Sequence, residues 1–158
     1  MKLSKSLYTR AIQCQKSLWL KKHNKDVLTP PNAAAQAIFE NGNEVGDLAC
    51  KLFPNGVEIP YLNTTFQDKI NLTQEYINQG TQNIYEATFE FDGILIMIDI
   101  LNIKDNSVII NEVKSSTQVK DIYLHDASIQ YYVLNGLGYD VKKVNIIHIN
   151  NEYVRDEE

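Results

Sequence analysis

Four stretches of the chain repeat apolar residues at the spacing of three and four that is typical of amphipathic helices. They cover residues 5–22, 33–52, 65–79 and 119–135. Ser4 is suited to cap the first of these helices, and Gly80 is suited to end the third. The apolar stripe of the first helix is Leu7, Ala11, Cys14 and Leu18. On the second helix, Ile38, Val45, Ala49 and Leu52 are expected to face inward.

Alternating or continuous apolar residues predict strands elsewhere. These are expected over residues 84–91, 94–103, 108–114 and 144–149, with a short edge strand at 57–60. The second strand is nearly all apolar, which is typical of burial on both faces. Asp92-Gly93 and residues 104–107 have the composition of hairpin turns. We therefore predict an α/β fold with a mixed sheet, in a single domain that spans residues 1–158.

The composition narrows the class of protein. A chain of 158 residues suits one domain, and 44% hydrophobic with 22% charged residues excludes a disordered tail or a coiled coil. The longest apolar run, residues 94–98, is far too short to span a bilayer, so we expect no membrane partner. Two cysteines without a secretory signal favour the reducing cytoplasm.

The charge balance bears on possible partners. There are 15 basic and 20 acidic residues, a net charge of −5, which excludes a wholly basic surface that binds nucleic acid indiscriminately. A local basic patch remains possible. The lysines that cluster early in the chain are Lys16, Lys21, Lys22 and Lys25.

Asp99 stands out because it interrupts the most apolar strand of the chain. A buried carboxylate is costly unless a cation compensates it. The next strand carries Glu112 and Lys114, which share a face because side chains alternate along a strand. An acid in an apolar strand, a hairpin and then Glu-x-Lys form a more specific pattern than any of these features alone.

Hairpin geometry predicts how these acids pair. A turn centred between Asp105 and Asn106 sets Asp99 opposite Glu112, and a turn at residues 92–93 sets Glu86 opposite Asp99. A three-residue loop or a bulge would instead move Asp99 to another face. Three facing carboxylates repel one another, so such a row persists most easily around a divalent cation, and hard oxygen ligands suit Mg²⁺ or Mn²⁺.

These features in this order resemble the PD-(D/E)XK nuclease superfamily: Asp99, then Glu112-Val113-Lys114 thirteen residues later. The following helix with Gln130 is similar to the RecB-like branch, which includes CRISPR-associated exonucleases. The predicted order of elements matches that superfamily's restriction-endonuclease-like αβββαβ core, with extra helices at the N-terminus. The segments that add to the resemblance, and look like an uncharacterised bacterial family placed in that superfamily, are residues 3–8, Cys14 and residues 18–20, 42–46 and 84–89.

The resemblance implies roles for individual residues. Asp99 and Glu112 would hold the metal, helped by the carbonyl of Val113. Lys114 would position the attacking water and stabilise charge at the phosphate. Two further acids are candidate metal ligands. The alternative for each is an ordinary solvated side chain with no role in the site. These acids are Glu44, in the region where RecB-like enzymes often carry a histidine, and Glu86.

Gln130 lies on an otherwise apolar helical stripe, where a buried amide needs a partner. In RecB-like nucleases this glutamine opens a Gln-x-x-x-Tyr motif near the active site. Here Leu134 occupies the tyrosine position, and Tyr131 and Tyr132 follow the glutamine directly. We assign Gln130 and Tyr131 as candidate nucleic-acid contacts. A core glutamine bonded to the backbone is the alternative for Gln130.

The cysteines and histidines do not form a recognisable iron–sulfur or zinc motif in the sequence. RecB-like exonucleases often bind an iron–sulfur cluster through one early and three late cysteines. Cys14 matches the early position and nothing matches the late ones, so we expect no cluster. Cys50 lacks a partner at zinc spacing. We expect His125 and Asp126 to form a pair on the helix surface.

The resemblance implies a nuclease that uses Mg²⁺ or Mn²⁺ to hydrolyse phosphodiester bonds, in DNA more readily than in RNA. A second hypothesis is a non-catalytic nucleic-acid-binding or assembly module with the same fold, part of a larger protein with a further domain or partner. A third is an unrelated α/β binding protein whose acids are solvated. The intact Asp99, Glu112 and Lys114 set favours the enzyme, whereas the net charge and Leu134 favour the module.

Overall fold

The structure is a computed structural model that describes residues 3–105 and 107–154. Its elements are, in chain order, β1 (Leu3–Ser4), α1 (Lys5–Gln13), α2 (Gln15–His23), the 3-10 helix η1 (Lys25–Val27), α3 (Ala33–Cys50), β2 (Val57–Glu58), α4 (Phe66–Asn78), β3 (Asn83–Phe91), β4 (Ile94–Lys104), β5 (Ser107–Lys114), α5 (Asp121–Gly136) and β6 (Asp140–His148).

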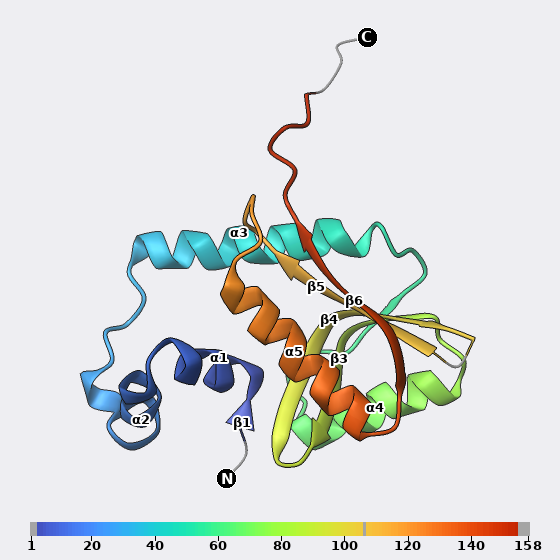
Figure 1. Cartoon of the computed structure of the whole chain (residues 1–158), viewed down its shortest axis with the longest axis horizontal. Helices are drawn as coiled ribbons and strands as arrows, with labels where there is room; N and C mark the ends of the chain where they lie inside the picture. The colour runs from blue at the N-terminus through green and yellow to red at the C-terminus, as the bar shows by residue number, and fades with distance from the viewer. Residues whose placement is uncertain (1–2, 106, 155–158) are drawn as a thin grey trace.

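The described strands form one six-stranded mixed sheet (Figure 1). Its order is β2-β3-β4-β5-β6, and β1 pairs with β4. β3, β4 and β5 are antiparallel neighbours, whereas β6 returns parallel to β5 after α5. α5 contacts β3 to β6 across one face of the sheet, and α4 packs against β3. The predicted α/β class is confirmed, and α4-β3-β4-β5-α5-β6 follows the predicted order of helix, three strands, helix and strand.

The core joins the sheet to α5, and the central strand β4 supplies much of it. The side chains of β4 that are buried are Leu95, Ile96, Ile98, Ile100 and Leu101. Val133 and Leu134 of α5 pack against this cluster with no exposed surface. Burial of β4 on both faces is confirmed, and Asp99 lies among the buried residues of this central strand.

The helix predicted over residues 5–22 is two helices. Cys14 has an extended backbone, with φ −163° and ψ 107°, and separates α1 from α2. No residue of either helix is buried, and Cys14 is exposed. The other residues of the apolar stripe, Leu7, Ala11 and Leu18, are half-buried, because this arm lies beside the sheet rather than under it (Figure 1).

The prediction that the apolar stripe of the second helix faces inward is only partly correct. Ala49 is buried, but Ile38 and Leu52 are 66% and 69% exposed. The N-terminal half of α3 extends past the sheet, and β5 is the strand that α3 contacts (Figure 1). Amphipathic spacing predicted the helix correctly, but it did not reveal how much of the helix lies over the core.

Helix length and polarity bear on membrane crossing. Within residues 3–105 and 107–154, none of the helices is both long enough and apolar enough to cross a bilayer.

Substitution of Gly136 tests how closely α5 packs on the sheet. An added Cβ there would lie 2.2 Å from Cε1 of Phe91. Gly136→Ala is expected to lower the free energy of unfolding by about 1–3 kcal/mol, because the ring must move. In the control Gly46→Ala, nothing lies within 4 Å of the new Cβ, and helix propensity predicts a gain of about 0.5–1 kcal/mol. Urea denaturation measures both, and a Gly136→Ala protein as stable as wild type would contradict the close contact.

Candidate active site

The candidate site lies where β4 and β5 separate. Their paired residues run from Lys104–Ser107 to Ile100–Asn111, which confirms the register predicted for this hairpin. One step further, the Oδ2 atom of Asp99 accepts a hydrogen bond of 2.6 Å from the Val113 amide. Asn106 of the predicted turn lies outside the described residues. Asp99 and Glu112 thus come from adjacent strands to the point where the ladder opens.

Glu86 lies on β3, the strand that borders β4 on the side away from β5. Tyr85 pairs with Ile100 and Ala87 with Ile98, so the register predicted for the first hairpin is also confirmed and sets Glu86 opposite Asp99. Glu86 itself is skipped in the ladder, and its φ of 57° lies in the left-handed region. That conformation costs a non-glycine residue on the order of 1–2 kcal/mol. Such strain is most often found at functional positions.

Glu112 is the most enclosed acid of the site, with 1% of its surface exposed. The Nζ atom of Lys5 donates to both carboxylate oxygens, at 3.0 and 2.9 Å. Lys114 donates to Oε1 at 2.6 Å, and Gln130 donates through Nε2 to Oε2 at 2.6 Å. Two cations and an amide therefore compensate a carboxylate that would otherwise be too costly to bury.

Asp126 belongs to the same network, so the prediction that it forms a surface pair with His125 is wrong. Asp126 is 6% exposed, and its Oδ2 accepts a hydrogen bond of 2.5 Å from Lys114 Nζ. His125 is exposed. Asp126 lies one helical turn before the buried Gln130, so the spacing of four residues could have placed both side chains on one face.

The charges of the site shift its pKa values in opposite directions. Burial raises the pKa of Glu112, but Lys5 and Lys114 outweigh it and hold the pKa at about 2. Burial raises the pKa of Asp99 to about 6, since Lys5 offsets the effect only in part and Glu112 adds to it. Burial lowers the pKa of Lys114, but Glu112 and Asp126 outweigh it, so the pKa is raised. Glu112 is therefore ionised and Lys114 charged at neutral pH.

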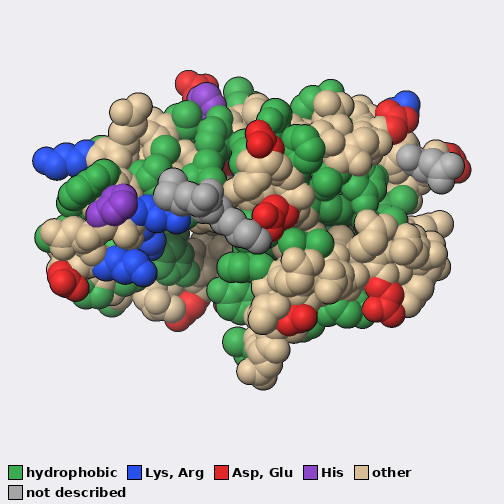
Figure 2. All heavy atoms as spheres, turned by 90° about the horizontal axis from the view of Figure 1, so that it is seen from below, with side chains coloured by type: hydrophobic (Ala, Val, Ile, Leu, Met, Phe, Trp, Pro, Cys, Tyr) green, Lys and Arg blue, Asp and Glu red, His purple; other side chains and the backbone are tan. Residues whose placement is uncertain are grey.

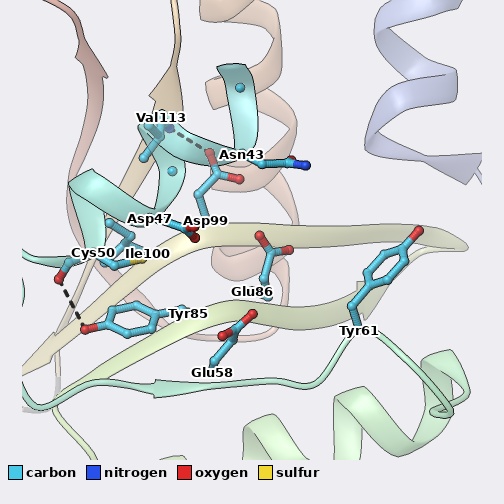
Figure 3. Close-up of a pocket in the computed structure, with 12 residues that line it drawn as sticks. Asn43, Asp47, Cys50, Glu58, Tyr61, Tyr85, Glu86, Asp99, Ile100 and Val113 are labelled. Atoms are coloured by element: carbon cyan, nitrogen blue, oxygen red, sulfur yellow. Dashed lines mark hydrogen bonds between the residues drawn. The ribbon is translucent and has the colours of Figure 1, made fainter. Parts of the chain in front are cut away.

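A cavity of about 810 Å³ adjoins the site at Glu86, Asp99 and Val113, whereas Glu112 and Lys114 do not line it. α3 supplies one wall, and β2, β3 and β4 supply the others. Figure 3 shows the carboxyl groups of Asp47, Glu86 and Asp99 turned into it, with the Tyr85 hydroxyl bonded to the Cys50 carbonyl. The cavity is wide enough for a small polar ligand or part of a chain, and its carboxylates would repel an anion unless a cation were bound with it.

Glu86 offers a test of this acidic wall through pH. Burial raises its pKa to about 7, and Asp99 adds to the effect. A raised carboxyl pKa means that stability falls as pH rises from about 4.5 to about 7. In metal-free buffer, Glu86→Gln is therefore expected to be more stable than wild type by about 1–2 kcal/mol at pH 8, allowing for solvent screening, and equal to it at pH 4.

The comparison is made by urea denaturation at the two pH values. The matched control is Glu58→Gln, an exposed carboxyl of β2 at the same cavity, which is expected to change the free energy of unfolding by less than about 0.5 kcal/mol. Equal stability of Glu86→Gln and wild type at pH 8 would contradict a desolvated Glu86.

The remaining sequence candidates are divided between the site and the surface. Glu44 is exposed and does not line the cavity, whereas Asn43 and Asp47 of the same helix do. Gln130 is fully buried and bonds Glu112 and the Asp126 carbonyl, so it positions the acid and does not reach the surface. Tyr131 is 46% exposed and accessible. Sequence reasoning missed Lys5 and Asp126.

The site holds donor atoms of the chemical type that binds a divalent cation, although they are not arranged around one. Asp99, Glu112 and Asp126 supply carboxylate oxygens, the ligands that Mg²⁺ and Mn²⁺ prefer. Oδ1 of Asp126 and Oε1 of Gln130 are buried without a hydrogen-bond partner among the described residues. In the arrangement described for residues 3–105 and 107–154, no three Asp, Glu, His or Cys side chains are disposed to hold a metal ion. Lys5 Nζ lies among the three carboxylates, 2.9 to 3.9 Å from their oxygens.

Comparisons of the chain with protein-family models, with curated proteins and with solved structures give no match.

Proposed function

We propose that the chain is a divalent-metal-dependent nuclease domain of the PD-(D/E)XK type, in the RecB-like branch, and that it hydrolyses phosphodiester bonds in DNA. The observation that carries the proposal is the opening of the sheet at Asp99. It brings Asp99 of β4 close to Glu112 and Lys114 of β5, in the register that the hairpin predicted, and Asp99 also lines a cavity.

The side chains have distinct roles in this proposal. Asp99 and Glu112 would hold Mg²⁺ or Mn²⁺ with the Val113 carbonyl, and Glu86 borders the same space. When bound, the ion lowers the pKa of water and offsets negative charge at the phosphate. Lys114 keeps a positive charge beside the scissile phosphate and donates to the attacking water. Gln130 orients Glu112 through its 2.6 Å hydrogen bond.

A basic surface supports a nucleic-acid partner. Figure 2 shows Lys and Arg side chains gathered at the end of the molecule formed by α1 and α2. Lys16, Lys21 and Lys25 are exposed there. Phosphates attract such clusters without regard to sequence. We place the protein in the cytoplasm, since both its cysteines are free thiols.

One observation favours a second candidate, a non-catalytic nucleic-acid-binding or assembly module. Lys5 and Lys114 already compensate Glu112 and Asp126, so the acids have cationic partners within the chain. A module that never binds a metal ion could retain this network to stabilise its fold.

The test is cleavage of end-labelled single- and double-stranded DNA, and of matched RNA, in Mg²⁺, Mn²⁺ or EDTA. We expect cleavage of DNA with either ion and none in EDTA. Absence of cleavage together with absence of Mn²⁺ binding by calorimetry would favour the non-catalytic module.

A further inference from the structure

Lys5 is positioned in the site by the N-terminal strand β1, which pairs with the central strand β4. β4 pairs with β3 along one edge, and on its other edge β5 pairs only from Ile100 onward. β1 occupies the far end of that second edge, where Leu3 pairs with Ile94 and Ser4 with Leu95. Ser4 then caps α1, and Lys5 is the first residue of the helix. The interval between β1 and β5 contains Asp99, and the N-terminal segment delivers Lys5 into it.

The Lys5 ammonium is surrounded by acidic oxygens. Its Nζ lies 3.0 and 2.9 Å from the two oxygens of Glu112. It also lies 3.9 Å from Asp99 Oδ1 and 3.9 Å from Asp126 Oδ1. The Lys5 side chain is only 19% exposed. Among these four oxygens it holds the central position that a coordinated cation would take.

The ammonium does not satisfy this set of oxygens. A separation of 3.9 Å is too long for a hydrogen bond, so Oδ1 of Asp126 has no hydrogen-bond partner among the described residues although its side chain is only 9% exposed. Oε1 of Gln130, which is fully buried, is also without a partner there. Buried acceptors left in this way indicate that a further ligand belongs in the site.

Charge balance indicates what that ligand does to Lys5. Asp99, Glu112 and Asp126 carry three negative charges when ionised, against two positive charges on Lys5 and Lys114. A divalent cation added to this cluster would make four positive charges. If Lys5 withdraws, positive and negative charges balance at three, and each oxygen of Glu112 keeps one donor, Lys114 or Gln130, in place of two.

We propose that Lys5 is a built-in cation of the site: it holds Asp99, Glu112 and Asp126 together in the metal-free protein, and a divalent cation displaces it and takes Asp126 as a further ligand. The inference rests on the proposed function, since it concerns the same metal site. It couples that site to the N-terminal arm, because Lys5 anchors the first turn of α1. Metal binding therefore loosens α1.

Calorimetric titration with Mn²⁺ alone tests the competition. Lys5→Met is expected to bind Mn²⁺ at least about tenfold more tightly than wild type, because no ammonium has to leave. Lys114→Met is the matched control, since it removes the same charge from a lysine that contacts Glu112 and Asp126 but lies outside the central position. It is expected to raise the affinity less.

The outcomes separate this proposal from the proposed function. Unchanged or weaker Mn²⁺ binding by Lys5→Met, with binding by wild type, overturns the role of Lys5 and leaves the metal site standing. Equal gains in the two variants show a general charge effect and also overturn it. No Mn²⁺ binding by any of the three proteins overturns the metal site and, with it, this proposal.

Hydrogen exchange of wild type gives a test that does not depend on a variant folding. At saturating Mn²⁺, amides in the first two turns of α1 are expected to exchange at least about threefold faster than in EDTA, since the helix loses its anchor. Amides of α4, which packs away from the site on β3, serve as the internal control. Unchanged or slower exchange in α1 with Mn²⁺ bound overturns the displacement of Lys5.

Discussion

Replacing Lys114 by alanine is expected to reduce metal-dependent DNA cleavage at least about 1000-fold. Lys114 Nζ lies 2.6 Å from Glu112 and 2.5 Å from Asp126, and these acids keep the ammonium charged. Alanine removes that charge and donor, which the proposed function places beside the reacting phosphate. Asp99→Asn is expected to act as strongly, because it removes a charged oxygen from the proposed metal site. Initial rates on labelled DNA in Mg²⁺ and Mn²⁺, with EDTA as the blank, measure both effects.

The matched control for this prediction is Lys104→Ala. Lys104 is an exposed lysine at the opposite end of β4 from the opening of the sheet. Its loss is expected to change the cleavage rate by less than about twofold, with circular dichroism confirming that each variant is folded. A folded Lys114→Ala protein that cleaves DNA as fast as wild type would show that the site is wrongly assigned.

Glu112→Ala is expected to lower the free energy of unfolding of the metal-free protein by about 3–5 kcal/mol at pH 7. The substitution leaves the ammonium groups of Lys5 and Lys114 and the amide of Gln130 without their shared acceptor. All three groups are buried or nearly so. Urea denaturation in EDTA measures the loss.

The pH dependence of that loss follows from the direction of the pKa shift. The pKa of Glu112 is lowered from 4.5 to about 2 in the folded protein, so its ionised form stabilises the fold above pH 4.5. This contribution is lost as the pH falls through about 2. The difference in stability between wild type and Glu112→Ala should therefore be largest near neutral pH and shrink toward pH 2.

An exposed ion pair provides the comparison for the buried one. Asp140 pairs with Lys142 at 2.7 Å, but their side chains are 57% and 62% exposed. Asp140→Ala is expected to cost less than about 1 kcal/mol. If Glu112→Ala cost no more than Asp140→Ala, the network around Glu112 would contribute nothing to stability.

Hairpins explain why part of the site could be predicted. The registers that bring Glu86 and Glu112 to the level of Asp99 depend on two short turns, and the register of a hairpin is set by the length of its turn. These acids are close along the chain, so local rules were sufficient. The irregular backbone of Glu86 was not predictable in the same way, because its φ of 57° depends on the packing around it.

The helices show that the spacing of apolar residues predicts a helix but not its burial. The stripe over residues 5–22 has helical spacing, yet Cys14 breaks it and no side chain of α1 or α2 is buried. Ile38 of α3 also lies on an apolar stripe, and its side chain is 66% exposed. An apolar stripe predicts that a helix forms, but burial requires a surface to pack against, and the position of that surface is a property of the whole fold.

The sequence by itself determined the order of helices and strands from α4 to β6 and the two hairpin registers around Asp99, because each depends on residues near one another in the chain. Only the tertiary structure decided that Lys5 bonds Glu112 across 107 positions of sequence, and that Asp126 turns inward. Both depend on where β1 and α5 meet the sheet. A charged residue in an isolated helical pattern gives no sign of the partner it will meet there, since that partner belongs to a distant element.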